Sequence, residues 1–296
     1  MINSRALIGV ASGWGAQNQS TELGAEYLQR AGVEQALVVE GLTCYWHSIL
    51  FPTERAKDSG KKPFEKRAVL VSQLCKRLAK ATAEIIQSDQ CPIILGGDHS
   101  MALGTWSGVT QALNNRRKFG LIWFDAHMDA HTRETSPSDA IYGMPVALLL
   151  GYGDKVLLEC MGQGPILDPK HIVLVGVRSY EEGEALLLKK LGVTLYFMHD
   201  IVQRGLATVM TEALQIVTQG PDGFGVSIDL DGFDPSFVPG VGAPVPNGIN
   251  PQEAYLELKK WFHHPQFRAL EIAEFNPTLD KKDKTVKVIQ NILLQS

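Results

Sequence analysis

The stretch GLIWFDAHMDAHT, Gly120 to Thr132, joins a short apolar run to alternating acidic and imidazole side chains. Within it, every second position after the apolar run is polar: Asp125, His127, Asp129 and His131. Side chains of a strand or an extended segment alternate between two faces, so these four could share one face. A buried strand that ends in two carboxylates and two imidazoles on one side predicts a binding site at its carboxyl end.

The rest of the chain is that of an ordinary globular protein. It has 296 residues, 45% of them hydrophobic, and a formal net charge of −4 with its Lys and Arg scattered, which argues against a nucleic-acid partner. No apolar run approaches the ~20 residues of a membrane span, and the N-terminus lacks a signal-peptide layout. The four cysteines are dispersed, without a CxxC pair. We therefore expect a cytoplasmic protein with reduced thiols, no nucleic-acid partner and no membrane span.

Short apolar, β-branched runs alternate with longer segments of helical period along the whole chain. The predicted strands are ALIGVA (6–11), ALVV (36–39), CPIIL (91–95), FGLIWF (119–124), HIVLVGV (171–177), VTLYFM (193–198), FGVSIDL (224–230) and RALEIAEF (268–275). Strands that are apolar throughout belong in a parallel sheet covered on both faces. The pattern predicts one domain, residues 1–296, with a three-layer α/β/α sandwich around a mainly parallel sheet.

Predicted helices fill most of the gaps between these strands. They cover residues 21–30, the basic amphipathic segment 66–87, a segment from about Met101, and the last stretch, residues 283–295. In sheets of this kind, ligands bind outside the carboxyl ends of the strands. The strand ends are therefore where a functional site is expected.

Two further strand ends carry the same residue types as the first. CPIIL is followed by GGDHS, with Asp98 and His99, and FGVSIDL leads into SIDLDGFDP, with Asp229, Asp231 and Asp234. Asp-Gly and Asp-Pro steps form ordinary turns, and Asp98 could simply cap a helix. Turns do not require this pattern at three strand ends, however, and several carboxylates at buried positions repel one another unless cations neutralise them. The combination predicts a metal site.

The ligand set points to the kind of metal. Four carboxylates and two imidazoles without a thiolate form an oxygen-rich set that suits manganese better than zinc. Six side chains are too many for one open catalytic ion, and they suit two ions that share bridging carboxylates.

The three segments GGDHS, DAHMD and SIDLDGFDP, in this order, resemble the three signatures of the arginase/agmatinase (ureohydrolase) family. The segments EFNP (274–277) and DPSFVPGVGAP (234–244) look more like the arginase branch. The resemblance implies an arginase-like α/β fold, two Mn²⁺ ions and hydrolysis of a small guanidino substrate to urea and an amine. L-Arginine, giving L-ornithine, is the first expectation, and a homo-oligomer, trimer or hexamer, is implied as well.

The resemblance also assigns roles to individual residues. Six side chains would be metal ligands: His99, Asp125, His127, Asp129, Asp229 and Asp231. One ion would be held by His99, Asp125, Asp129 and Asp229, and the other by His127, Asp125, Asp229 and Asp231, so that Asp125 and Asp229 bridge. Asp129 would also orient the hydroxide between the ions, and Glu274 would pair with the substrate guanidinium.

Outside the metal ligands, the chain departs from the family pattern. Where arginases carry a stretch like SGNLHG, this chain has SDAIYG, 138–143. Tyr142 replaces the histidine that passes a proton to the leaving amine. Ala140 replaces an asparagine that helps to hold the substrate carboxylate, whereas Ser138 keeps its hydroxyl. Tyrosine has an unperturbed pKa of about 10 and is a poorer proton carrier at neutral pH, unless its surroundings lower that pKa.

Two further departures lie at the expected substrate-recognition residues. His131 replaces the usual asparagine, and Glu181 replaces the aspartate that contacts the substrate amino group. One hypothesis is that the preferred substrate differs from L-arginine, since losing a partner for a charged group can switch preference. Another is that His131 takes over proton transfer. Agmatinase, guanidinobutyrase or formiminoglutamase activity stays open, as does a catalytically weak protein that binds a guanidino ligand.

Overall fold

A computed structural model describes residues 4–56, 62–114, 116–162 and 164–296. Its centre is an eight-stranded sheet in the order β2-β1-β3-β8-β7-β4-β5-β6, with every neighbouring pair parallel. The strands are β1 Arg5–Val10, β2 Cys44–Leu50, β3 Cys91–Leu95, β4 Gly120–Phe124, β5 Ile172–Val177, β6 Thr194–Phe197, β7 Phe224–Asp229 and β8 Phe267–Ala273. The predicted parallel sheet is confirmed, and seven of the eight predicted strands lie within a residue or two of the observed ones.

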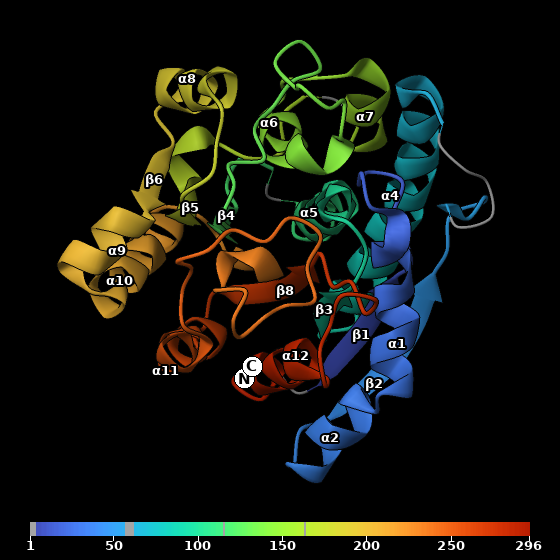
Figure 1. Ribbon diagram of the computed structural model, residues 1–296, viewed down its shortest axis with the longest axis vertical. Coiled ribbons are helices and arrows are strands. Elements are labelled where there is room, and N and C mark those ends of the chain that lie inside the picture. Colours follow the sequence, from blue (N-terminus) through green and yellow to red (C-terminus); the bar gives the residue numbers. More distant parts are fainter. Residues whose placement is uncertain (1–3, 57–61, 115, 163) are drawn as a thin grey trace.

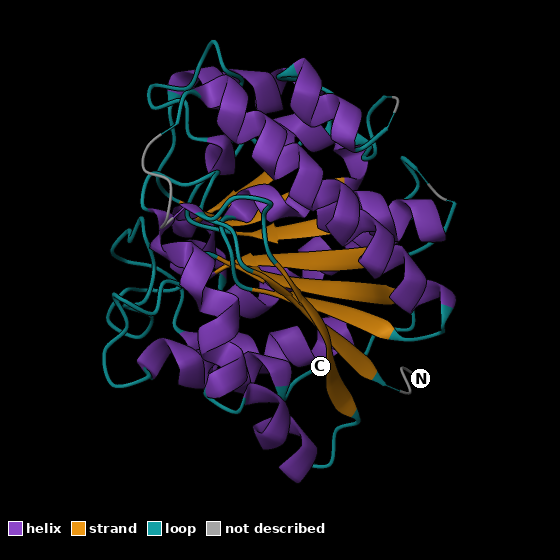
Figure 2. Ribbon diagram, turned by 90° about the vertical axis from the view of Figure 1, so that its right-hand side faces the viewer, coloured by secondary structure: helices purple, strands orange, loops and turns teal. Residues whose placement is uncertain are grey.

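Helices cover both faces of this sheet (Figures 1 and 2). The α-helices are α1 Gly24–Arg30, α2 Val33–Val39, α4 Phe64–Gln87, α5 Ala102–Ala112, α6 Pro145–Leu149, α7 Lys155–Cys160, α8 Glu182–Leu191, α9 Met198–Arg204, α10 Leu206–Thr218, α11 Pro251–Phe262 and α12 Lys284–Leu293. Short 3₁₀ helices span Gln19–Leu23, His99–Met101, Ile141–Gly143, Pro169–His171 and Leu230–Gly232. None of the described helices is long and apolar enough to cross a bilayer.

The alternation of side chains along the central strand β4 explains the three layers. Ile122 and Phe124 pack into one core with α1, α2, α10, α11 and α12. Leu121 and Trp123 point the other way, into a core with α4, α5, α6 and α7. A strand has a side-chain period of two, so an apolar run of this kind must be covered on both faces. The predicted α/β/α sandwich is confirmed.

The predicted strand ALVV (36–39) is wrong. These residues form the end of α2, which begins after Gly32, a glycine with φ +72°. Val33 and Leu37, four positions apart, are buried, whereas Val38 and Val39 are exposed at 49% and 83%. A burial spacing of four is helical, and a short apolar run cannot be assigned to a strand or a helix by composition alone. The strand beside β1 comes later, as β2.

Candidate metal centre

The four adjacent strands in the middle of the sheet carry most of the predicted site residues. In sheet order these strands are β3, β8, β7 and β4; Figure 1 labels β3, β8 and β4. His99 follows β3, Glu274 follows β8, Asp229 ends β7 and Asp125 follows β4. Because all four strands are parallel, their carboxyl ends lie at the same edge of the sheet. Segments far apart in the sequence therefore meet there.

Two acidic residues beside the predicted ligands have structural roles. Asp98 is fully buried, and its carboxylate accepts hydrogen bonds from the backbone N–H groups of Gly15 (3.0 Å) and Ser100 (3.1 Å). Asp234 accepts hydrogen bonds from the backbone N–H groups of Ser236 (3.0 Å) and Gly248 (3.1 Å). Both side chains hold turns, as short polar side chains commonly do. They fix the loops on which the predicted ligands lie.

The first cluster of predicted ligands surrounds one imidazole nitrogen. His99 Nδ1 lies 3.1 Å from Asp129 Oδ2, 3.1 Å from Asp229 Oδ2 and 3.4 Å from Asp125 Oδ2. All four side chains are buried. The indole of Trp123 stacks on the His99 ring, with centroids 4.0 Å apart, and its Nε1 donates to Asp125 Oδ2 at 2.8 Å. Four donor atoms thus converge from three strand ends in a fixed arrangement.

A second cluster shares one residue with the first. His127 Nδ1 lies 3.2 Å from Asp231 Oδ2 and 3.5 Å from Asp125 Oδ1. The two oxygens of Asp125 therefore face different clusters. Asp229 contributes Oδ2 to the first cluster, while its Oδ1 accepts the backbone N–H of Asp231 at 2.9 Å. All six residues predicted as metal ligands are present in these two adjacent clusters.

The chemistry of these clusters fits bound cations. Asp129 Oδ2 is buried and accepts no hydrogen bond, although His99 Nδ1 is 3.1 Å away. Burial, and then the Asp125 carboxylate, raises the pKa of Asp129 to about 7. Burial, and then its neighbours Asp231 and Asp125, also raises the pKa of Asp229 well above its usual range. Crowded buried carboxylates stay ionised only beside positive charge, which divalent ions would supply.

Two of the predicted site residues have a strained backbone. Asp129 has φ +48° and Glu274 has φ +66°, in the left-handed region that residues other than glycine rarely adopt. Such strain costs of order 1–3 kcal/mol for each residue and is concentrated at functional sites. Other residues with positive φ, such as Asp89 and Asn114, lie outside the clusters. Within the site, the strain falls on the predicted hydroxide-orienting residue and the predicted guanidinium partner.

Glu274 lies directly beside the first cluster. Its Oε1 accepts the backbone N–H of His99 at 2.8 Å, and its side chain is buried. Burial, followed by the charges of Asp229 and Asp98, raises the pKa of Glu274 well above its usual range. Its second oxygen, Oε2, lies 4.0 Å from the position that a Cβ would take on Gly242. A buried carboxylate in these surroundings is a binding partner for a cation such as a guanidinium group.

A third cluster brings His131 and Glu181 together with Glu184, which was not predicted. His131 Nε2 lies 3.0 Å from Glu181 Oε2 and 3.7 Å from Glu184 Oε1. Glu184 is buried, and its carboxylate accepts the backbone N–H groups of Ala130 (3.1 Å) and Glu181 (3.0 Å). Glu181 and Glu184 form a capping box at the start of α8. The spacing E-x-x-E before an apolar helical run is the signal that could have identified Glu184.

The remaining predicted residues lie on the segment between Asp129 and α6. Burial, followed by the charges of Glu274 and Asp129, raises the pKa of Tyr142. Its hydroxyl therefore stays protonated and can donate a hydrogen bond, rather than act as a base. Ala140 is buried, whereas Ser138 is exposed and its Oγ accepts the Ala140 N–H at 3.3 Å.

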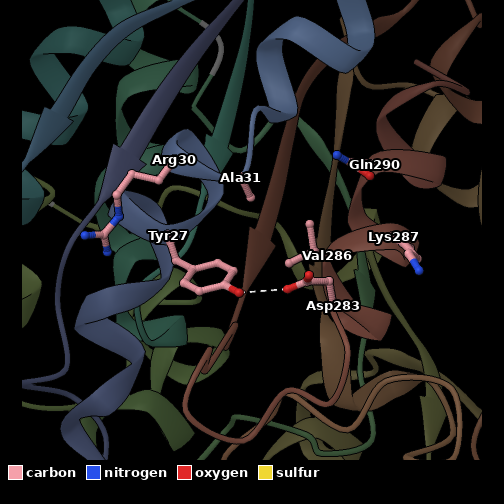
Figure 3. Close-up of a pocket in the computed structure, with 7 residues that line it drawn as sticks. All are labelled: Tyr27, Arg30, Ala31, Asp283, Val286, Lys287 and Gln290. Atoms are coloured by element: carbon pink, nitrogen blue, oxygen red, sulfur yellow. Dashed lines mark hydrogen bonds between the residues drawn. The ribbon is translucent and has the colours of Figure 1, made fainter.

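A cavity of about 480 Å³ lies away from these clusters, between α1 and α12 (Figure 3). Its lining includes Tyr27, whose hydroxyl donates to Asp283 at 2.7 Å, together with Arg30 and Lys287. None of the residues predicted for the site lines it.

Comparison with known proteins agrees with the geometry of the site. The sequence profile of the arginase family matches residues 3–296. The arginase of Bacillus caldovelox is 35% identical over 290 residues, which are 96% of this chain and 94% of the relative. A solved structure of arginase from Bacillus caldovelox superposes with a TM-score of 0.91 at 34% identity and covers 99% of this chain and 98% of its own. A solved arginase from Bacillus subtilis gives a TM-score of 0.88 at 32% identity, covering 99% and 97%. The chain belongs to the arginase family.

Proposed function

We propose that this hydrolase of the arginase family converts L-arginine and water to L-ornithine and urea, with two manganese ions bound at the carboxyl ends of β3, β4 and β7. The observation that carries the proposal is the pair of clusters that share Asp125, one around His99 and the other around His127. The relatives named above as arginases support the choice of substrate.

The two clusters would divide the metal ions between them. One ion would be held by His99, Asp125, Asp129 and Asp229, and the other by His127, Asp125 and Asp231. The family resemblance adds Asp229 to the second set. Oxygen-rich ligands with two imidazoles and no thiolate favour manganese over softer-ligand metals. When bound, two divalent ions would lower the pKa of a water molecule, so that a nucleophile is available near neutral pH.

The side chains of this chain would perform the remaining steps. Glu274 would pair with the substrate guanidinium and hold its central carbon beside the two clusters. Asp129 Oδ2, which accepts no hydrogen bond from the protein, would accept one from the attacking water and fix its direction. When the water oxygen has bonded to the guanidinium carbon, the bond from that carbon to the alkyl nitrogen breaks. Urea and the amine are then released.

The leaving amine needs a proton, which the attacking water loses and Asp129 would pass on. Two further residues are candidates to assist this transfer. Tyr142 has a neutral hydroxyl near Glu274 and Asp129, and it would donate a hydrogen bond to the amine nitrogen. His131 has both ring nitrogens engaged, with Nδ1 3.1 Å from Thr135 Oγ1 and Nε2 3.0 Å from Glu181 Oε2. We assign the direct contact to Tyr142, and to His131 the task of holding Glu181 at the far end of the substrate.

A second candidate function is the hydrolysis of a related substrate. The observation that favours it is the contact between His131 and Glu181. The imidazole pairs with a carboxylate that could otherwise bind the ammonium group of a substrate. Ala140 is also buried without a polar side chain to offer a substrate carboxylate. Agmatine, 4-guanidinobutyrate and N-formimino-L-glutamate are therefore the comparison substrates.

The test is product release from L-arginine and these three compounds by protein loaded with Mn²⁺, with metal-stripped protein as the control. The proposal predicts metal-dependent urea release, with the highest kcat/KM for L-arginine. A higher kcat/KM for another compound would move the assignment to that substrate. No turnover of any of the four by protein with bound manganese would contradict the proposal.

The family resemblance also supports assembly as a trimer or hexamer and a cytoplasmic location. Light scattering on the purified protein would give the number of chains in the assembly.

A further inference from the structure

The metal-facing imidazole of His99 has a second nitrogen that points away from the clusters. Nε2 lies 2.9 Å from Ser227 Oγ, in the interior of the protein. The stacked indole of Trp123 holds the plane of the imidazole ring. The proton distribution between the two ring nitrogens then depends on what Ser227 offers to Nε2.

Ser227 is hydrogen-bonded in turn to a buried glutamate. Its Oγ donates to Glu271 Oε1 at 2.7 Å. Ser227 on β7 pairs in register with Glu271 on β8 and with Trp123 on β4, so the three side chains lie in a row on one face of the sheet. Glu271 Oε2 accepts a hydrogen bond from the hydroxyl of Thr105 on α5. His99, Ser227, Glu271 and Thr105 are all fully buried.

Glu271 has no ordinary structural reason for its position. It is a fully buried carboxyl group in the middle of β8, between the buried side chains of Leu270 and Ile272. In the part of the chain that the structure describes, the one basic group within 4.0 Å is His99, whose Nε2 is 3.9 Å from Oε1. An acidic side chain at this depth is costly to bury and is retained where it performs a task.

The hydrogen-bond directions define that task. A serine hydroxyl has one proton to donate, and both Glu271 oxygens accept a hydroxyl hydrogen bond, one from Ser227 and one from Thr105. The Ser227 proton is therefore directed to Glu271, and the Ser227 oxygen is left to accept a hydrogen bond from His99 Nε2–H. With its proton on Nε2, the neutral imidazole has a lone pair on Nδ1, the atom that faces three carboxylates.

We propose that Glu271, supported by Thr105, is a positioning residue that acts through Ser227 to keep His99 in the tautomer whose Nδ1 binds a metal ion. The inference rests on the metal binding proposed above and adds residues outside the ligand set. Partners of this kind orient metal-bound histidines, and their loss typically costs roughly 10- to 100-fold in metal affinity.

The experiment measures both Mn²⁺ dissociation constants of the full-length protein from the electron paramagnetic resonance signal of free Mn²⁺. The variants are Ser227→Ala, Glu271→Leu, Glu271→Gln, Thr105→Val and the double variant Ser227→Ala/Glu271→Leu. Thr110→Val is the matched control, since Thr110 is a buried threonine on the same helix whose hydroxyl donates to the helix carbonyls of Trp106 (2.9 Å) and Ser107 (3.3 Å).

Ser227→Ala and Glu271→Leu should each raise the dissociation constant of one of the two manganese ions by roughly 10- to 100-fold. The dissociation constant of the other ion should stay within about threefold of the wild-type value. Glu271→Gln keeps an oxygen that accepts the Ser227 hydroxyl. The Thr105 hydroxyl, which already lies 3.5 Å from Met101 O, can then donate to that carbonyl. The manganese affinity of this variant should therefore stay near that of the wild type. The double variant should lose no more affinity than Ser227→Ala alone, because both changes break the same chain of hydrogen bonds. At saturating manganese, kcat should recover in every variant.

Three results would each overturn the inference. The first is a manganese affinity in Glu271→Leu equal to that of the wild type, and the second is a loss of affinity in Glu271→Gln as large as that in Glu271→Leu. The third is a double variant whose loss is the product of the two single losses. Thr105→Val gives a milder test if Glu271→Leu folds poorly, and it should weaken the same ion, whereas Thr110→Val should not. Urea release is measured separately on the wild-type protein. If manganese binds and the variants lose affinity as stated while L-arginine is not hydrolysed, the proposed substrate fails and this inference stands.

Discussion

The backbone N–H of His99 donates a 2.8 Å hydrogen bond to Glu274 Oε1. In the opposite direction, the backbone N–H of Glu274 donates to Gly97 O at 2.9 Å. The turn that carries a predicted metal ligand and the residue predicted to hold the guanidinium are therefore joined by two hydrogen bonds. These two bonds hold both the backbone and the side chain of Glu274 against the turn that carries His99. The position of a guanidinium carbon relative to the metal ions would then be fixed, which favours the reaction.

Glu274→Gln should reduce catalysis without releasing metal. The variant keeps the size of the side chain but loses the charge that pairs with guanidinium, which is worth about 1.5–3 kcal/mol, or roughly 10- to 150-fold in kcat/KM. Glu159→Gln is the matched control, because Glu159 is an exposed glutamate on α7. Steady-state urea release, together with the manganese content, measures the effect. Unchanged kcat/KM would remove Glu274 from the substrate site.

Tyr142→Phe should lower kcat more than it changes KM. The phenol hydroxyl stays protonated in its buried, acidic surroundings, and its loss removes the donor to the leaving amine. General acid contributions are typically about 10²–10⁴-fold, so a loss near the lower limit is expected for a single hydrogen-bond donor. A kcat equal to that of the wild type would show that another residue or solvent protonates the amine.

His131→Asn should change substrate preference more than turnover. The imidazole holds Glu181 through a 3.0 Å contact, and its removal leaves Glu181 and Glu184 available to a substrate ammonium group. We expect the ratio of kcat/KM for L-arginine to that for 4-guanidinobutyrate, which lacks the amino group, to rise by about tenfold. A collapse of kcat for both compounds, with KM unchanged, would instead assign proton transfer to His131.

Removing the metal ions should destabilise the protein more as the pH rises. In the stripped protein, burial and Asp125 raise the pKa of Asp129 to about 7, so the stability that its bound proton contributes is lost as the pH rises from about 4 to about 7. The pKa values of His99 and His127 are raised by the surrounding carboxylates, and the stability that their protonation contributes is also lost as the pH rises. Free metal at 100 times its Kd raises the free energy of unfolding of the loaded protein by about 2.7 kcal/mol.

The Tm difference between loaded and stripped protein should therefore grow from about pH 5 to about pH 8. Thermal unfolding with and without a chelator at several pH values measures it. A difference that stays constant or shrinks would contradict this reasoning.

Periodicity predicted most of the sheet, because strands such as β3 and β4 are apolar throughout and end in recognisable turns. The order of the strands could not be read in this way. That β8 lies between β3 and β7 depends on crossover connections and on packing against both helix layers. The failure at ALVV has a local cause, since the spacing of Val33 and Leu37 decides the helix and lies partly outside the four residues assigned to a strand.

The clustering of the candidate ligands could be predicted because Asp and His at three strand ends form an unusual pattern. The residues behind it were harder to find. Ser227 and Glu271 lie inside strands that were interpreted as apolar, although a polar residue within such a strand is a signal in itself. Their contact with His99 and with each other depends on the register between β7 and β8, which the sequence does not display.

Two metal ions bound between these strand ends would give two peaks in anomalous X-ray diffraction at the manganese edge from crystals soaked in Mn²⁺. One should lie among His99, Asp125, Asp129 and Asp229, and the other between His127 and Asp231, with Asp125 contacting both. A single peak, or two peaks bound by other residues, would contradict this arrangement.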